Sequence, residues 1–207
     1  MGKVRGEKPM FPDLERIKKH NPLLIGEKEA LKAAVCIALI ENGDDYDVLF
    51  EVRSSSIPRQ PGEVCLPGGV VEEGETYEET AVRETCEELL ILPEQIQIIG
   101  ASDIMFGRSR LVYPYVGILK DYQGTFSERE VAETFRVPLH YLKETPPEMY
   151  AAETSTQYDD RFPDELIWGN KSFKGYSQKS EEIYYLYEGH VIWGMTARII
   201  TAFLKLI

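Results

Sequence analysis

The chain has 207 residues, of which 43% are hydrophobic and 28% are charged. This composition is ordinary for a globular protein with a core of useful size, and the length suits one compact domain with some elaboration. The formal net charge is −12, and such a surface repels nucleic-acid backbones and anionic membranes. We therefore expect neither as a partner, and an anionic substrate would need a metal ion, an arginine cluster or both beside it.

The sequence contains no pattern that predicts export or membrane insertion. The N-terminal stretch MGKVRGEKPM has no apolar segment of the kind that a signal peptide needs. The apolar run near the other end carries Arg198 and Lys205 and is too short to span a bilayer. Cys36, Cys65 and Cys86 lack a C-x-x-C spacing, which favours reduced thiols over a disulfide or a zinc site. We expect a soluble, cytoplasmic protein that is a monomer or a homodimer.

The first part of the chain predicts a short helical extension followed by strands. PDLERIKKH at 12–20 begins with proline and ends with basic residues, which is typical of a short helix within an extension covering 1–30. Residues 32–41 are rich in Ala, Val and Ile and predict a buried strand, with a helix as the alternative. A returning strand is expected at 44–54 after an Asn-Gly-Asp-Asp turn, and the following loop includes a short strand near 64–66.

A strongly acidic helix is predicted over 77–89, with one arginine in its middle. Thr76 and Glu79 have the spacing of a capping box, so Thr76 is the expected N-cap, and Pro93 marks the stop. Like charges four residues apart destabilise a helix by a few tenths of a kcal/mol per pair. The segment therefore needs a reason to hold so many carboxylates together.

The middle of the chain mixes further strands with a short helix. Strands are expected at 94–102 and at 110–120, the second broken by Pro114. Residues 127–144 predict a turn, a strand and a short helix. Residues 145–182 are rich in Pro, Ser, Thr and Tyr and predict an irregular insertion on the surface.

The chain ends with a predicted hairpin over 181–194, which turns at Glu188-Gly189, and an amphipathic helix over 195–207. Strands and helices thus follow one another without regular βαβ alternation. This order predicts a single domain with an α/β fold of the α+β type, in which helices pack on both faces of a mixed sheet.

On a helical wheel the acidic helix has a buried face and an adjoining charged stripe. The buried face collects Ala81, Val82, Thr85, Cys86 and Leu89. Glu84, Glu87 and Glu88 share the stripe at the border of the core, with Arg83 beside Glu87. One interpretation is a solvated acidic face, which is what most charge runs are. The other is a site for a hard divalent cation such as Mg²⁺ or Mn²⁺, which takes carboxylate oxygens and would remove the repulsion.

This segment resembles the signature of the Nudix hydrolases, G-x5-E-x7-R-E-U-x-E-E-x-G-U, in which U is a bulky apolar residue. The matching residues are Gly69, Glu75, Arg83, Glu84, Glu87, Glu88 and Ile91. Thr85 stands at an apolar position, where its methyl group can pack. Leu90 replaces the last glycine, which normally permits a left-handed helix end, and this leaves room for a distortion there. Within the signature, Arg83 and Glu75 would pair to hold the loop and the helix in place.

The resemblance implies a Nudix-like α/β/α sandwich and the hydrolysis of a nucleoside diphosphate linked to another moiety, with Mg²⁺ or Mn²⁺ as cofactor. It makes Glu84, Glu87 and Glu88 metal ligands or water-activating groups, with the Gly69 carbonyl as a further ligand. Arg83 belongs to the same catalytic set. The chemistry agrees, because metal ions neutralise the anionic diphosphate oxygens and lower the pKa of a bound water.

Upstream, LFEVRSSSIPRQPGEVCLPGG at 49–69 is similar to a signature of the coenzyme A diphosphatase branch of that family. The residues that keep its spacing are Arg53, Ser54, Gly62, Pro67, Gly68 and Gly69. Arg59, the second arginine, stands one residue late, while Glu51 occupies a threonine position and Leu66 a phenylalanine position. The resemblance implies cleavage of coenzyme A or a derivative to 4′-phosphopantetheine and adenosine 3′,5′-bisphosphate.

Arginines beside the site would offset the acidic surface, because guanidinium forks match phosphate geometry. Arg53 and Arg59 are the substrate-binding candidates, together with Gly68; the alternative for either arginine is an ordinary surface or salt-bridging role. A general base outside the signature is expected in SEREVAE at 127–133, where Glu130 fits best, although plain loop acids explain that stretch equally well.

Two other functions stay open. One is an ADP-ribose or nucleotide-sugar diphosphatase, and the other is a catalytically silent sensor of a nucleotide ligand. The intact Glu84, Glu87 and Glu88 argue against the sensor. Arg108 and Arg110, at the start of the expected strand, are weaker candidates for a substrate contact.

Overall fold

The computed structural model describes residues 15–18, 20–22, 24–107, 109–159, 161–163, 166 and 176–207. Residues 1–30 and 31–207 form two units. The first unit contains α1 (Glu15–Lys18), which confirms part of the short helix predicted near the N-terminus. The remainder of that prediction at residues 12–14 and 19, and the candidate Arg108, lie outside the described residues.

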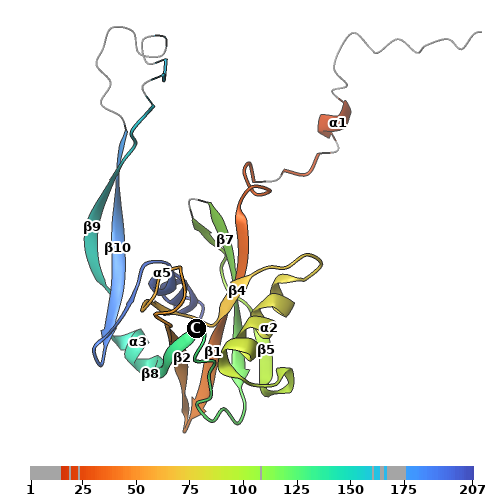
Figure 1. Ribbon diagram of the computed structural model, residues 1–207, viewed down its shortest axis with the longest axis vertical. Helices are drawn as coiled ribbons and strands as arrows, with labels where there is room; N and C mark the ends of the chain where they lie inside the picture. The colour runs from red at the N-terminus through yellow and green to blue at the C-terminus, as the bar shows by residue number, and fades with distance from the viewer. Residues whose placement is uncertain are drawn as a thin grey trace, which may run out of the picture. The chain divides into compact units, whose positions relative to one another are not determined.

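The second unit is built on an eight-stranded mixed sheet (Figure 1). Its centre is β1 (Leu31–Asn42), which pairs in parallel with β7 (Arg110–Leu119) and antiparallel with β2 (Asp45–Arg53). β5 (Ile96–Ala101) extends the sheet beyond β7, and β8 (Val131–Pro138) extends it beyond β2. The predicted strands are confirmed, and β1 is buried over most of its length because both faces of the sheet are covered.

β1 and β2 separate beyond their shared ladder, and a short segment fills the gap between them. β8 runs along one edge of β2, so β1 and β3 (Val64–Cys65) share the other edge. Likewise β7 covers one edge of β1, so β2 and β4 (Gly68–Val70) share the opposite edge. The Pro-Gly-Gly sequence at 67–69 is therefore held between two central strands, and a loop over 71–76 connects β4 to the acidic helix.

Strand β7 is continuous, so the predicted break at Pro114 is wrong. Pro114 pairs with Val35 within the parallel ladder to β1. On the other side, its carbonyl accepts a hydrogen bond from the Ser102 N–H at 2.8 Å. The N–H that proline lacks would point to this same side, in the gap between the end of β5 and the start of β6 (Met105–Gly107). Proline at this position removes no bond to β1, and the strand tolerates it.

Helices cover both faces of the sheet, which confirms the α/β/α sandwich of the α+β type (Figure 1). α2 (Tyr77–Leu89) covers one face and leads through the 3₁₀ turn η1 (Pro93–Gln95) into β5. α3 (Leu139–Glu144) and α5 (Gly194–Phe203) cover the other face, α5 being the predicted C-terminal helix. Among the helices of the described residues, none has the length and apolar composition needed to cross a bilayer.

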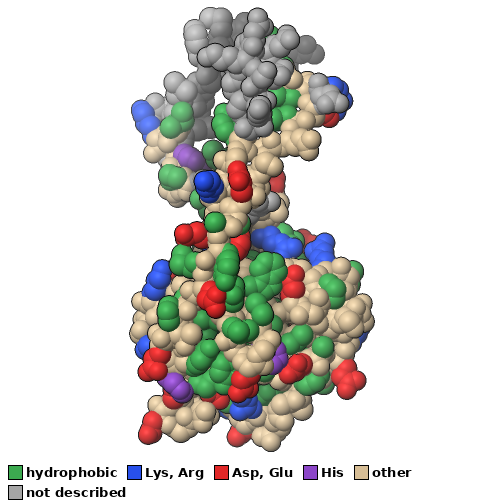
Figure 2. All heavy atoms as spheres, turned by 90° about the vertical axis from the view of Figure 1, so that its left-hand side faces the viewer, with side chains coloured by type: hydrophobic (Ala, Val, Ile, Leu, Met, Phe, Trp, Pro, Cys, Tyr) green, Lys and Arg blue, Asp and Glu red, His purple; other side chains and the backbone are tan. Residues whose placement is uncertain are grey.

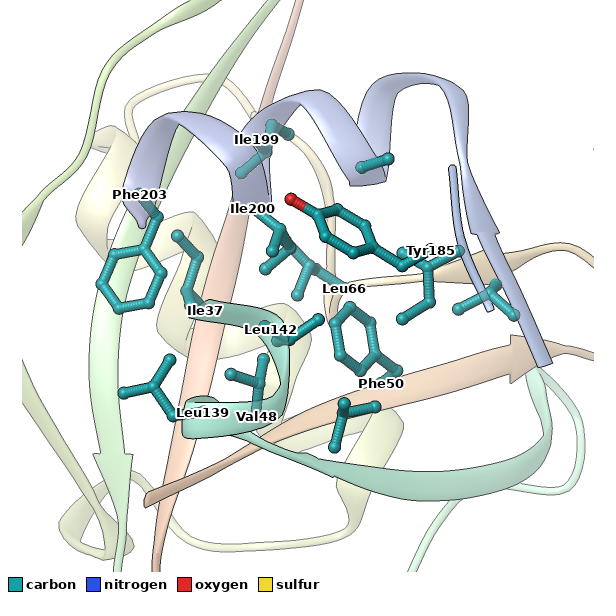
Figure 3. Packing of buried hydrophobic residues seen from close by; sticks show 14 of the residues in the cluster. Ile37, Val48, Phe50, Leu66, Leu139, Leu142, Tyr185, Ile199, Ile200 and Phe203 are labelled. Carbon is teal, nitrogen blue, oxygen red and sulfur yellow. The ribbon is translucent and has the colours of Figure 1, made fainter. Parts of the chain in front are cut away.

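Two buried clusters hold these layers together. Beneath α2, Leu89 packs with Cys36 of β1 and Leu49 of β2. The larger cluster fills the opposite face, where side chains of α5 and α3 meet the sheet (Figure 3). Its labelled members are Ile37, Val48, Phe50, Leu66, Leu139, Leu142, Tyr185, Ile199, Ile200 and Phe203. Burial of such apolar surface is the main stabilising term of the fold.

Residues 145–182, predicted to be an irregular insertion, contain regular strands. β9 (Glu148–Ser155) and β10 (Ser177–Tyr187) form an antiparallel ladder, and β11 (His190–Trp193) completes a three-stranded sheet. The prediction was wrong for β9 and the first part of β10, because most residues of β9 are exposed on both faces, whereas the predicted hairpin at 181–194 is confirmed by β10 and β11. The sequence of β9 therefore lacks the apolar alternation of a half-buried strand.

The turn between β10 and β11 lies at Glu188 and Gly189, as predicted, and both residues are left-handed, with φ of 48° and 86°. The register pairs Leu186 with Val191 on the face opposite the buried Tyr185, and these two side chains are exposed. Figure 2 views the molecule from the side of β9 and β10 in Figure 1, and hydrophobic side chains gather on the face it shows.

Candidate functional site

The acidic helix α2 is anchored at its first turn by the predicted capping box. The Glu79 N–H donates to Thr76 Oγ1 at 3.2 Å, and the Thr76 N–H donates to Glu79 Oε2 at 2.8 Å. This reciprocal pair satisfies N–H groups that have no partner inside the helix. The cap fixes where the helix begins, and so the direction in which Glu84 and Glu88 project.

The other end of α2 keeps the left-handed conformation that a glycine would adopt. Leu90 has φ 54° and ψ 47°, and its N–H donates to the Cys86 carbonyl. The helix end is therefore regular. The distortion that the replacement of glycine by Leu90 made conceivable does not occur. A side chain in this conformation costs about 1 kcal/mol, since its Cβ approaches the backbone. Ile91 follows and is buried beneath the helix.

Arg83 links α2 to the loop that precedes it. Its Nε donates to Glu75 Oε1 at 2.7 Å and its Nη2 to Glu75 Oε2 at 3.1 Å, a bidentate pair. The Arg83 hydrogen bonds hold the pKa of the Glu75 carboxyl at about 2. Nη1 donates to Glu84 Oε1 at 2.9 Å, and Glu87 is farther away at 3.5 Å. The predicted pairing of Arg83 with Glu75 is confirmed, and it makes Arg83 a brace beside Glu84.

Two glycines bring the carboxylates of α2 against the backbone of β4. A Cβ at Gly69 would collide with the carboxyl group of Glu84. The Gly68 N–H donates to Glu88 Oε2 at 2.8 Å, and a Cβ at Gly68 would collide with the backbone of β1. The Gly-Gly pair is thus the local reason why this helix can present its acids so close to the sheet.

Burial and mutual repulsion strain the carboxyl groups at this point. Glu88 is 5% exposed, and its burial, followed by the charges of Glu84 and Glu130, raises its pKa to about 8. Burial also raises the pKa of Glu84. In β2 the Glu51 carboxyl is buried as well, and its burial, together with the charge of Glu88, raises its pKa well above the ordinary range. Each shift shows that an ionised carboxylate is disfavoured here without a compensating cation.

Of these carboxyl groups, those of Glu84, Glu88 and Glu130 line a cavity of about 460 Å³. Its charged lining residues are Arg53, Arg59, Glu63, Glu84, Glu88, Arg110 and Glu130. Gly68 and Gly69 form part of the wall, and Trp193 and Met195 add apolar surface at the start of α5. Arg53 Nε donates to the Arg59 carbonyl at 3.2 Å, which ties the two predicted arginines together. The fold therefore gathers most of the predicted site residues around one space.

Two predicted residues do not line this cavity among the residues described. The Arg83 guanidinium is paired with Glu75, and the Glu87 side chain is 60% exposed. Three residues that sequence reasoning did not assign are nearby: Trp193 and Met195 in the wall, and Glu51 beneath Glu88. The departure of Glu51 from the expected threonine was the one signal in the sequence that pointed to it.

The donor set fits a hard divalent cation. Carboxylate oxygens of Glu84, Glu88 and Glu130 suit Mg²⁺ or Mn²⁺, and the buried Glu51 Oε1 has no hydrogen-bond partner among the described residues. Within the same part of the chain, no three acidic, histidine or cysteine side chains are already grouped around one ion position. Like charges repel when no cation lies between them, so the ligands have to close in when the ion binds.

Comparison with known proteins gives consistent matches. A family model described as NUDIX domain matches residues 30–160. The peroxisomal coenzyme A diphosphatase NUDT7 of Mus musculus is 36% identical over 129 residues, which cover 61% of this chain and 54% of that protein. An uncharacterized Nudix hydrolase NudL of Enterobacter sp. (strain 638) is 30% identical over 174 residues, which cover 82% of this chain and 79% of that protein. The chain spans about half the length of the mouse relative.

Among solved structures, this chain is similar to a C. elegans Ap4A hydrolase binary complex. The match has 22% sequence identity and a TM-score of 0.47, and it covers 56% of this chain and 85% of that one. Fold and site together define an α/β/α protein in which a loop and helix gather carboxylates at a cavity suited to an anionic ligand. The family model covers more than half of the sequence, and the chain belongs to the Nudix hydrolase family. Hydrolases of this family generally need divalent metal ions.

Proposed function

We propose that the protein hydrolyses the diphosphate bond of coenzyme A or a derivative, with Mg²⁺ or Mn²⁺, and releases 4′-phosphopantetheine and adenosine 3′,5′-bisphosphate. The observation that carries this proposal is the cavity that Glu84, Glu88 and Glu130 share with Arg53 and Arg59. Carboxylates suit a cation and guanidinium groups suit phosphates, so the combination suits a metal-bound diphosphate.

Two likenesses support coenzyme A as the substrate. The upstream stretch at 49–69 resembles the signature of the coenzyme A diphosphatase branch, and both of its arginines line the cavity. The mouse relative is named as a coenzyme A diphosphatase. Coenzyme A also carries a phosphate on its ribose besides the diphosphate, which gives a second anionic group for the arginines to bind.

Five residues of the site receive a role in this proposal. Glu84, Glu88 and the Gly69 carbonyl would hold the cation, which supplies charge neutralisation and an acidified water when bound. Arg83 holds Glu84 in orientation through their 2.9 Å hydrogen bond. Glu130 would accept the proton of the attacking water, because it enters the cavity from a loop fixed at both backbone groups.

The direct test is a substrate panel with metal titration. Purified protein is given coenzyme A, an acylated coenzyme A and ADP-ribose with Mg²⁺ or Mn²⁺, and the products are identified by mass. We expect 4′-phosphopantetheine, or its acylated form, and adenosine 3′,5′-bisphosphate from the coenzyme A substrates. Faster cleavage of ADP-ribose would favour the nucleotide-sugar alternative. Absence of turnover on every diphosphate would favour the ligand sensor.

The arginines permit a sharper comparison of two matched substrates. If Arg59 binds the ribose phosphate, Arg59→Ala should raise KM for coenzyme A about 10-fold or more, the loss of one charge-assisted contact. KM for dephospho-coenzyme A, which lacks that phosphate, should stay within about twofold. Arg110→Ala removes another arginine of the same cavity and is the comparison: it should change KM for the two substrates by the same factor. Equal effects of Arg59→Ala on the two substrates would contradict the assignment.

The cytoplasmic location is likewise a proposal from the sequence.

A further inference from the structure

Glu51 is a buried carboxylate that the proposed reaction does not use. It lies in β2, opposite Cys65 of β3 and Thr134 of β8, and is 1% exposed. Its Oε1 has no hydrogen-bond partner among the described residues. An ionised carboxylate in such a place is strongly unfavourable unless a positive charge compensates it. The coenzyme A diphosphatase signature that this stretch resembles has an uncharged threonine at this position.

The Glu51 side chain lies on the face of the sheet that α2 covers. Residues of a strand alternate between faces, so Glu51 shares a face with Leu49, which belongs to the cluster beneath α2. The charge of Glu88 is among the causes that raise the pKa of Glu51, so the two buried carboxyl groups are neighbours. Arg53 is the cationic group near both, but it lines the cavity and donates to the Arg59 carbonyl. Glu51 therefore forms the buried floor behind Glu88.

We propose that Glu51 is a further positioning residue of the metal site, whose charge draws the divalent cation toward Glu88 from the buried side. Glu88 accepts the Gly68 N–H from one direction and meets Glu51 from another, so the pair fixes how its carboxylate faces the cavity. Without a cation, Arg53 is the positive group that acts on both Glu51 and Glu88. A cation bound there would compensate the charge of Glu51 as well. This inference rests on the proposed function only in requiring a metal at Glu84 and Glu88, not on which diphosphate is cleaved.

The test is direct Mn²⁺ binding to the full-length, metal-free protein without substrate, by electron paramagnetic resonance or calorimetry. Glu51→Gln keeps the shape of the side chain and removes its charge. We expect it to weaken Mn²⁺ binding about 10- to 100-fold, the usual effect of a lost partner behind a ligand. The matched control is Asp47→Asn, because Asp47 is also buried in β2 but bonds Asn42 away from the site. The control should bind Mn²⁺ as the wild type does.

Thermal unfolding separates this role from a purely structural one. Without metal, Glu51→Gln should be as stable as the wild type or more so, because the amide neither buries a charge nor has to take up a proton when the chain folds. With Mg²⁺, its gain in Tm should be smaller than that of the wild type. A residue that only fills space would lower Tm equally in both conditions. If Glu51→Gln does not fold, Glu51→Thr, the residue of the resembled signature, is measured in the same way.

The outcomes distinguish this inference from the proposed function. Mn²⁺ affinity of Glu51→Gln within about twofold of the wild type would overturn it, as would a wild type that binds no Mn²⁺. Weaker binding in Glu51→Gln but not in Asp47→Asn supports it, even if coenzyme A proves not to be the substrate.

Discussion

Glu84 reaches the cavity because residue 69 has no side chain. The carboxyl group of Glu84 occupies the space in which a Cβ of Gly69 would stand. Arg83 holds the same carboxyl group from the other side. The Glu84 carboxyl group is therefore packed against the Gly69 backbone on one side and bonded to the Arg83 guanidinium on the other, so it has little freedom to move. This suits a side chain that must face a metal and a substrate together.

Gly69→Ala should therefore displace Glu84 while leaving the fold intact. The new methyl group forces the carboxyl group away from the cavity, and a misplacement of about 1 Å costs about 100-fold in rate. We expect kcat/KM for the best substrate of the panel to fall by that order, with circular dichroism unchanged. Gly100→Ala is the matched control, because a Cβ there meets no atom within 4 Å. Full activity in Gly69→Ala would show that Glu84 need not occupy this position.

The sequence identified the acidic residues of the site but not how each one is used. Spacing along the helix placed Glu84, Glu87 and Glu88 on one stripe, yet Glu88 is buried and Glu87 is exposed outside the cavity lining. Neighbouring helical residues differ by about 100° in direction, and the exact rotation of α2 on the sheet decides between them. Glu51 could not be assigned from the sequence, because its role depends on the packing of β2 beneath α2.

Elements were predicted well wherever an apolar pattern reflects burial. The central strands and α2 with its cap are confirmed for that reason. Pro114 misled because the tolerance of a strand for proline depends on which neighbour its missing N–H would face, and that is a property of the sheet. β9 was missed because an exposed strand has no apolar pattern to read. The local sequence thus indicates which segments are buried, but it does not indicate which strands pair with one another in the sheet.

The end of α2 allows a test of the element itself. Leu90 is left-handed and 60% exposed, so its side chain pays a conformational penalty and contributes little packing. Leu90→Gly should raise the free energy of unfolding by about 1 kcal/mol, measured by urea denaturation. Leu92→Gly is the control, because Leu92 is 65% exposed but has an ordinary φ of −92°. The control should lose about 0.5–1 kcal/mol, since glycine is more flexible when unfolded. Equal losses in both variants would refute the argument.

The charge of the whole molecule sets how its stability responds to pH. The chain carries a net charge of −12, and its buried acids add a local repulsion at the cavity. The carboxyl of Glu75 acts in the opposite sense, because its folded pKa of about 2 lies below its ordinary value near 4.5. The stability that ionised Glu75 contributes to the folded state is present above about pH 4.5 and is lost as the pH falls toward 2. Between about pH 5 and 8 the stabilising contribution of Glu75 is constant.

Glu88 should therefore make the metal-free protein less stable as the pH rises. Its folded pKa of about 8 exceeds the ordinary 4.5, so its stabilising effect is complete below about pH 4.5 and is lost as the pH rises toward 8. In chelator, we expect Tm to be lower at about pH 8 than at pH 5 by several degrees, at roughly 2–4 °C per kcal/mol. The general repulsion of an acidic surface has the same sign, so Glu88→Gln is the control that isolates this carboxyl and should flatten the profile.

Added Mg²⁺ should reverse this trend. The cation binds the ionised carboxylates and not the protonated ones, so its gain in Tm should be larger at about pH 8 than at pH 5. In Glu88→Gln the gain should be small at both pH values, because a principal ligand is missing. A wild type whose Tm in chelator is the same at both pH values would mean that Glu88 ionises as easily in the folded chain as in the unfolded one. The strain that the cation is expected to relieve would then be absent.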